Sequence, residues 1–151
     1  MGKTSIDDVL EFAIQAEEGA YRFYLDLAGR TQNSALCREL EGYAQEELGH
    51  KQKLEKLRRG EASLQVSAEG VADLQLADYL VEVEPGPDLS YQDALILAMK
   101  REKAAFRLYS DMAATARDSD SKELFLALAQ EEAKHKLRFE IEYDDVVLEG
   151  N

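Results

Sequence analysis

The chain has 151 residues, of which 45% are apolar, and it carries a formal net charge of −13 and a single cysteine, Cys37. This length predicts one domain with a substantial core, and the apolar content argues against a disordered chain. The acidic balance without a basic face argues against nucleic-acid binding, and one cysteine excludes an internal disulfide or a Cys-x-x-Cys metal site. There is no run of about 18 apolar residues and no apolar signal core near the start, so we expect a cytoplasmic protein without a membrane span.

Four long helices are predicted in chain order. They are expected over about residues 5–30, 33–59, 90–117 and 118–143. Ser5 and Asp8 resemble a capping box at the start of the first helix. Gly60 follows a basic last turn and marks the end of the second helix. At 1.5 Å per residue, each helix of roughly 25 residues is about 38 Å long.

The predicted connections are unequal. Short links join the first helix to the second and the third to the fourth, which makes two antiparallel hairpins. Residues 60–89 form a long crossover between the hairpins, with a short amphipathic helix expected over 73–82 and a break at Pro85-Gly86-Pro87. This connectivity predicts an all-α, ferritin-like four-helix bundle. The domain is expected to cover residues 1–143, followed by a tail over 144–151.

The only two histidines of the chain occur in one repeated motif. Residues 44–51 read Ala-Gln-Glu-Glu-Leu-Gly-His-Lys, and residues 129–136 read Ala-Gln-Glu-Glu-Ala-Lys-His-Lys. The same offset of 85 residues aligns Glu17 with Glu102. The chain is therefore an ungapped two-fold repeat, and its matching positions include every histidine available as a metal ligand.

Charged residues of this repeat interrupt apolar heptad stripes that must face the bundle core. The residues concerned are Glu17, Glu47, His50, Glu102, Glu132 and His135. Neither lysine nor arginine lies on these stripes, and a lone buried charge costs several kcal/mol, so we expect cations between the carboxylates. Carboxylate and imidazole ligands without thiolate suit iron or manganese, or zinc. Glu46 and Glu131 fall on another helix face and are predicted as outer residues; a bundle that has lost its metal and a mononuclear zinc site remain alternatives.

Four segments of the repeat form a recognisable pattern: Glu17-x6-Tyr24, Glu46-Glu47-x-x-His50, Glu102-x6-Tyr109 and Glu131-Glu132-x-x-His135. In these segments the chain resembles the rubrerythrin-like branch of the ferritin-like di-iron superfamily, and the resemblance spans about residues 5–143. It implies two iron ions held by the six residues above, with Glu47 and Glu132 bridging them. It also implies that Tyr24 and Tyr109 hydrogen-bond ligand carboxylates, whereas plain core packing is the alternative for both.

Two departures from the family pattern bear on activity. One cysteine cannot form the rubredoxin-like iron site of rubrerythrins, which has four cysteine ligands, so an electron donor such as rubredoxin would be a separate protein. Ala105 stands where rubrerythrins carry an additional glutamate. The resemblance implies reduction of hydrogen peroxide or dioxygen by a homodimer. The alternatives are ferrous iron oxidation and iron handling, a non-catalytic metal-binding bundle, and oxygenation of an organic substrate, for which the sequence shows no pocket.

Overall fold

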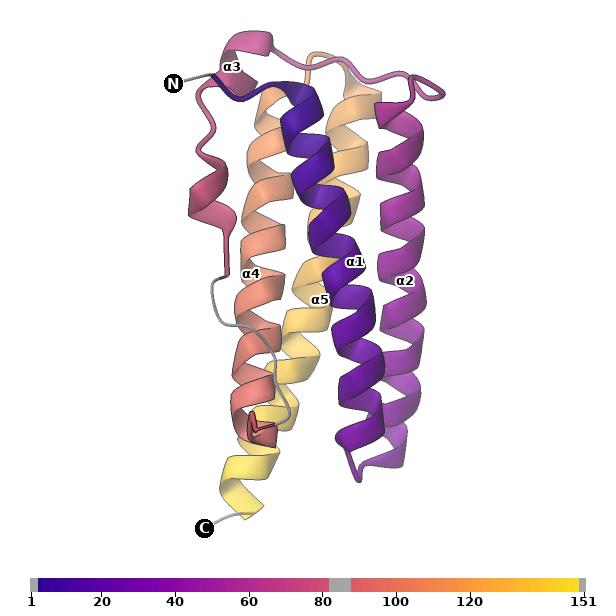
Figure 1. Cartoon of the computed structure of the whole chain (residues 1–151), viewed down its shortest axis with the longest axis vertical. Coiled ribbons are helices and arrows are strands. Elements are labelled where there is room, and N and C mark those ends of the chain that lie inside the picture. Colours follow the sequence, from indigo (N-terminus) through magenta and orange to yellow (C-terminus); the bar gives the residue numbers. More distant parts are fainter. Residues whose placement is uncertain (1–2, 82–87, 150–151) are drawn as a thin grey trace.

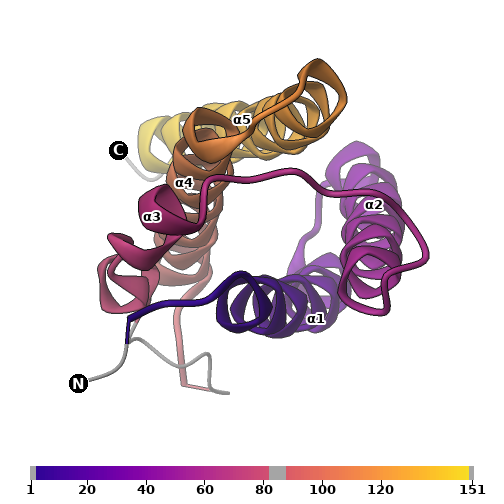
Figure 2. The ribbon, with the colours of Figure 1, turned by 90° about the horizontal axis from the view of Figure 1, so that it is seen from above.

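Four long helices form the computed structural model, which describes residues 3–81 and 88–149. They are α1 (Ile6–Arg30), α2 (Ser34–Arg58), α4 (Tyr91–Thr115) and α5 (Ser119–Glu149) (Figure 1). Helices α1 and α2 form one antiparallel hairpin and α4 and α5 the other, and the two hairpins face each other when viewed along the bundle (Figure 2). The predicted all-α bundle of two hairpins is confirmed.

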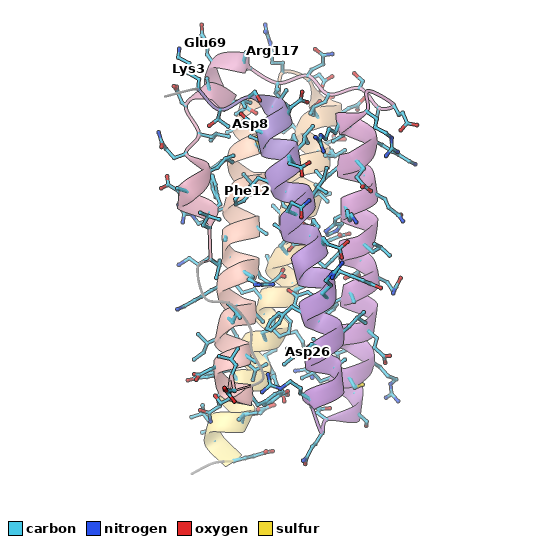
Figure 3. The ribbon with its side chains drawn as sticks, viewed as in Figure 1. Lys3, Asp8, Phe12, Asp26, Glu69 and Arg117 are labelled. Atoms are coloured by element: carbon cyan, nitrogen blue, oxygen red, sulfur yellow. The ribbon has the colours of Figure 1, made fainter. Side chains whose placement is uncertain are left out.

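Local capping sets where the helices begin. The Ser5 hydroxyl accepts from the Asp8 backbone N–H at 3.1 Å, and the Asp8 carboxylate in the first turn of α1 (Figure 3) accepts from the Ser5 N–H at 3.0 Å. Asn33 and Ser90 cap α2 and α4 in the same position. Gly60 follows α2 with a φ of 75°, a left-handed conformation that glycine adopts without strain. The caps thus fix where the helices begin, and the apolar stripe of each helix decides which residues face the core.

The described part of the crossover does not contain the single short helix that was predicted over residues 73–82. Its helical turns are α3 (Ala68–Ala72) and the 3₁₀ helix η1 (Leu76–Tyr79). Helix α3 starts early because the Ser67 hydroxyl accepts from the Gly70 N–H at 3.1 Å. The segment passes over one end of the bundle and then lies beside α4 (Figures 1 and 2). The predicted break at 85–87 lies outside the described residues.

The predicted C-terminal tail is wrong for residues 144–149, which continue α5 as helix. Glu142 of α5 is only 5% exposed, and each of its carboxylate oxygens accepts a hydrogen bond. One comes from the Tyr91 hydroxyl at 2.9 Å and the other from the Asn33 amide at 3.3 Å. Val146 then packs on the core cluster that contains Phe139. These contacts hold the last turns of α5 against the bundle. They were not predicted from the sequence because their partners lie on other helices.

The apolar core is divided into two clusters along the bundle. One contains Leu10, Leu54 and Phe125, and the other contains Leu27, Leu36 and Phe139. Between the two clusters lies a layer of buried carboxylates and imidazoles. The apolar layers on both sides exclude water from this polar layer. Among the described residues, no helix is long and apolar enough to cross a membrane.

Candidate metal centre

Six ionisable side chains meet in the middle of the bundle, and all four long helices contribute. Each of them is at most 2% exposed: Glu17 from α1, Glu47 and His50 from α2, Glu102 from α4, and Glu132 and His135 from α5. The three-residue spacing within each Glu-x-x-His motif places the carboxylate and the imidazole on one face, about one turn apart. The structure therefore brings together all six residues that the repeat singled out.

These side chains form two overlapping groups. Within each group, one potential ligand atom per residue lies within 4.8 Å of the others. The first group is Glu17, Glu47, His50 and Glu132, and the second is Glu47, Glu102, Glu132 and His135. Each group offers three carboxylates and one imidazole, a set of oxygen and nitrogen donors that suits iron, manganese or zinc. Glu47 and Glu132 belong to both groups, which places their carboxylates where they can contact two cations at once.

The converging atoms are close together but not hydrogen-bonded. His50 Nδ1 lies 3.1 Å from Glu132 Oε1, 3.3 Å from Glu17 Oε2 and 3.3 Å from Glu47 Oε1. His135 Nδ1 lies 3.5 Å from Glu47 Oε1 and 3.5 Å from Glu102 Oε2. All these buried atoms lack a hydrogen-bond partner among the described residues. Buried polar atoms without partners are rare, and a cation bound between them would satisfy the whole set.

Electrostatics supports the same interpretation. Burial, together with repulsion from Glu132, raises the pKa of Glu17 to about 7. Burial and neighbouring carboxylates also raise the pKa of Glu47 and of Glu102 well above the usual range. Burial acts against ionisation of Glu132 too, but the nearby His50 imidazole and the neighbouring carboxyls outweigh it and lower its pKa. Without a cation, the cluster therefore retains protons that a bound metal would displace.

The outer nitrogen of each histidine contacts a glutamate from the opposite hairpin. His135 Nε2 lies 2.5 Å from Glu46 Oε2 on α2, and His50 Nε2 contacts Glu131 on α5. A carboxylate at Nε2 favours a proton there and leaves Nδ1 free to bind a cation. The side chains of Glu46 and Glu131 are 48% and 42% exposed, so they do lie at the outer rim as expected.

These two contacts were not predicted from the sequence. Glu46 immediately precedes the inward Glu47 of the first motif and contacts His135 of the second. Glu131 in turn precedes Glu132 of the second motif and contacts His50 of the first. The doubled glutamate in both repeats was the available signal. Helical periodicity assigned Glu46 and Glu131 to an outer face, but it could not show that this face borders the opposing histidine.

The two repeat tyrosines differ in their contacts. Tyr109 donates from its hydroxyl to Glu17 Oε1 at 2.6 Å, within the buried core. Tyr24 is fully buried, and its hydroxyl has no hydrogen-bond partner among the described residues. Its ring packs edge-on against His135, with the ring centroids 6.1 Å apart. The structure thus shows the expected carboxylate contact for Tyr109, whereas Tyr24 makes packing contacts.

Comparison with known proteins identifies the family. The sequence model of the rubrerythrin family matches residues 8–143. This chain belongs to the rubrerythrin family. Its single cysteine distinguishes these 151 residues from rubrerythrins that carry an iron site with four cysteine ligands. No curated protein sequence matches this rubrerythrin-family chain.

Two solved structures share the fold. A protein from Thermotoga maritima described as a ferritin-like diiron-carboxylate protein has a TM-score of 0.75 and 20% identity, covering 97% of this chain and 99% of its own. A hypothetical protein from Pyrococcus furiosus has a TM-score of 0.68 and 26% identity, covering 93% of this chain and 89% of its own. The predicted ferritin-like bundle is therefore confirmed. Membership of the rubrerythrin family and the buried cluster together support a di-iron protein.

Proposed function

We propose that this rubrerythrin-family protein binds two iron ions and reduces hydrogen peroxide, or dioxygen, with electrons from an external donor. The observation that carries the proposal is the pair of overlapping ligand groups that share Glu47 and Glu132. Four carboxylates balance the charge of two divalent cations, which removes the cost of burying them. Two bound ferrous ions would supply the two electrons that reduction of peroxide requires.

Each residue of the site has a distinct part in the proposal. Glu47 and Glu132 would bridge the two ions, Glu17 and His50 would complete one site, and Glu102 and His135 would complete the other. Tyr109 holds one oxygen of Glu17 by its 2.6 Å hydrogen bond and so orients the second oxygen toward the cluster.

The rim residues would orient the imidazoles. Glu46 and Glu131 accept from Nε2 of the two histidines, so Nδ1 stays directed at the carboxylates. Tyr43 stacks on the His135 ring at 4.0 Å between centroids and covers this side of the site. The apolar layers above and below exclude bulk water, which strengthens every electrostatic contact inside.

We further propose that the donor is a separate protein such as rubredoxin and that the chain forms a homodimer. The dimer proposal is supported by exposed apolar side chains that recur along one face of α5: Leu126 (40% exposed), Leu137 (57%), Ile141 (47%) and Leu148 (72%). An apolar stripe of this kind favours association with another surface. Light scattering after size exclusion tests the dimer directly, and Leu137→Glu should shift the population toward monomer.

Anaerobic metal analysis followed by rapid mixing tests the main proposal. We expect two irons per chain, oxidation of the reduced protein by peroxide, and turnover when rubredoxin and its reductase are supplied. Brisk oxidation by dioxygen, with no reaction toward peroxide and no turnover with the donor, would support iron handling instead. A protein whose melting temperature rises with metal, but whose reduced site reacts with neither oxidant, would be a non-catalytic metal-binding bundle.

A further inference from the structure

A cavity of about 400 Å³ lies between α1 and α4 and reaches the carboxylate cluster. Its inner end is formed by Glu17, Glu47, Glu102 and Glu132. This volume equals that of roughly a dozen waters in the liquid, and pockets for small organic molecules begin at about 300 Å³. Peroxide and dioxygen each contain only two heavy atoms, so the cavity is much larger than either oxidant requires.

The walls of the cavity are mostly apolar. Phe12 of α1, labelled in Figure 3, and Leu108 of α4 contribute large side chains. Between the two helices the lining residues are small, including Ala16, Ala20 and Ala105, and this leaves the space open. An apolar wall offers water few hydrogen bonds and favours an apolar molecule.

The crossover closes one side of the cavity with a fixed wall. Tyr79, Leu80 and Val81 line it. The Tyr79 hydroxyl donates to Asp111 of α4 at 2.5 Å, and the Arg107 guanidinium lies 5.8 Å from the centre of the Tyr79 ring. These contacts hold Tyr79, the largest side chain of this wall, against α4.

The opposite side of the cluster is built differently. There the imidazoles of His50 and His135 contact Glu131 and Glu46, and Tyr43 stacks on His135. Groups that fix the histidines therefore occupy the α2 and α5 side, whereas the α1 and α4 side leaves space beside the carboxylates. A molecule bound in the cavity would lie next to the proposed metal site.

Arg101 is the one basic side chain among the described residues that line the cavity. Its guanidinium lies 5.1 Å from the centre of the Phe23 ring. It also lies close to Gly19, where an added Cβ would be 3.6 Å from Arg101 Nη1. Arginine binds carboxylates through paired N–H donors in a planar fork, which makes Arg101 the residue of this lining that is suited to an anionic group.

We propose that this cavity binds a small organic acid, with its apolar chain along the α1 and α4 walls and its carboxylate at Arg101. The position of the ligand beside two metal ions rests on the proposed function, whereas binding itself does not. The cavity was not foreseen from the sequence, because it depends on how α1, α4 and the crossover are packed together.

Calorimetric titration tests the proposal with octanoate as the probe. Protein loaded with zinc, which has no redox chemistry, is titrated with octanoate and with two controls. Octanol has the same alkyl chain but no carboxylate, and acetate has the carboxylate but no long alkyl chain. We expect octanoate to bind, and both other probes to bind at least about tenfold more weakly. An absence of octanoate binding to zinc-loaded protein would overturn the proposal.

Variants separate the two parts of the proposed site. Ala105→Leu should fill the cavity and weaken octanoate binding at least about tenfold, whereas Ala133→Leu, at a half-buried alanine of α5 away from the cavity, should not. Ala16→Leu, at an exposed cavity-lining position of α1, repeats the test if Ala105→Leu loses zinc. Unchanged affinity in the cavity-filling variant that retains zinc would overturn the proposal.

Arg101→Gln tests the carboxylate contact. It should weaken octanoate about tenfold and leave octanol unchanged. An equal loss for both probes would overturn the assignment of the carboxylate to Arg101. Binding of octanoate by a protein whose reduced site reacts with neither peroxide nor dioxygen would refute only the proposed function. Reaction with either oxidant without octanoate binding would refute only this inference.

Discussion

Replacing Tyr109 by phenylalanine removes one hydroxyl from the centre of the bundle. That hydroxyl donates to Glu17 Oε1 at 2.6 Å, and each of the two residues is only 2% exposed. A hydrogen bond to an ionised acceptor contributes about 1.5–3 kcal/mol to stability, and one between neutral groups about 0.5–1.5 kcal/mol. Because burial raises the pKa of Glu17 to about 7, the acceptor is mostly neutral below that pH and mostly ionised above it. We therefore expect Tyr109→Phe to lower the free energy of unfolding of metal-free protein by about 1 kcal/mol at about pH 6 and by about 2 kcal/mol at about pH 8.

Tyr24→Phe is the matched control, because Tyr24 occupies the equivalent position of the repeat and its hydroxyl has no partner among the described residues. We expect this variant to be as stable as the original protein or slightly more stable. Urea unfolding followed by far-ultraviolet circular dichroism, at the two pH values, measures both changes. Equal losses in the two variants, or a Tyr109→Phe loss that does not grow with pH, would refute the reasoning.

The remaining predictions concern metal and pH. Glu47→Ala or Glu132→Ala should leave at most one metal ion per chain by elemental analysis even with metal in excess, because each removes a proposed bridge. Glu46→Ala removes only the contact at His135 Nε2 and should still bind two ions when metal is in excess. Equal loss from the two classes would contradict the assignment. Glu46→Gln and Glu131→Gln should weaken metal affinity about 10- to 100-fold in chelator competition, and unchanged affinity would show that the contacts at the histidines have no effect on binding. Metal-free protein should lose stability as pH rises from 4.5 to about 7, because folded Glu17 keeps a proton that the unfolded chain releases. Metal binding in that pH range should release protons from the cluster, and the apparent metal affinity should therefore rise with pH. Titration calorimetry in two buffers of different ionisation enthalpy measures the number of protons released.

The contacts at the two histidines also connect the hairpins. Glu46 of α2 reaches His135 of α5, and Glu131 of α5 reaches His50 of α2. The Arg138 guanidinium of α5 adds a bond to Glu39 of α2 at 2.6 Å. The side of the bundle formed by α2 and α5 is thus joined by polar contacts, whereas the side formed by α1 and α4 contains the cavity. An ungapped repeat in the sequence has produced a site with two chemically different sides.

The sequence by itself determined the bundle, its two hairpins and the six buried ligand candidates, through helical periodicity, the unequal lengths of the connections and the internal repeat. This was possible because a charged residue on an apolar heptad stripe must face the core wherever its helix is placed. Periodicity assigns a residue to a face, but a hydrogen bond depends on the distance between atoms of different helices. Tertiary packing therefore decided that the Tyr109 hydroxyl donates to Glu17, while the Tyr24 hydroxyl has no hydrogen-bond partner among the described residues. It also decided that Glu46 and Glu131 reach the histidines. Packing of the crossover against α4 also decided the apolar cavity beside the carboxylates, which no single helix encodes.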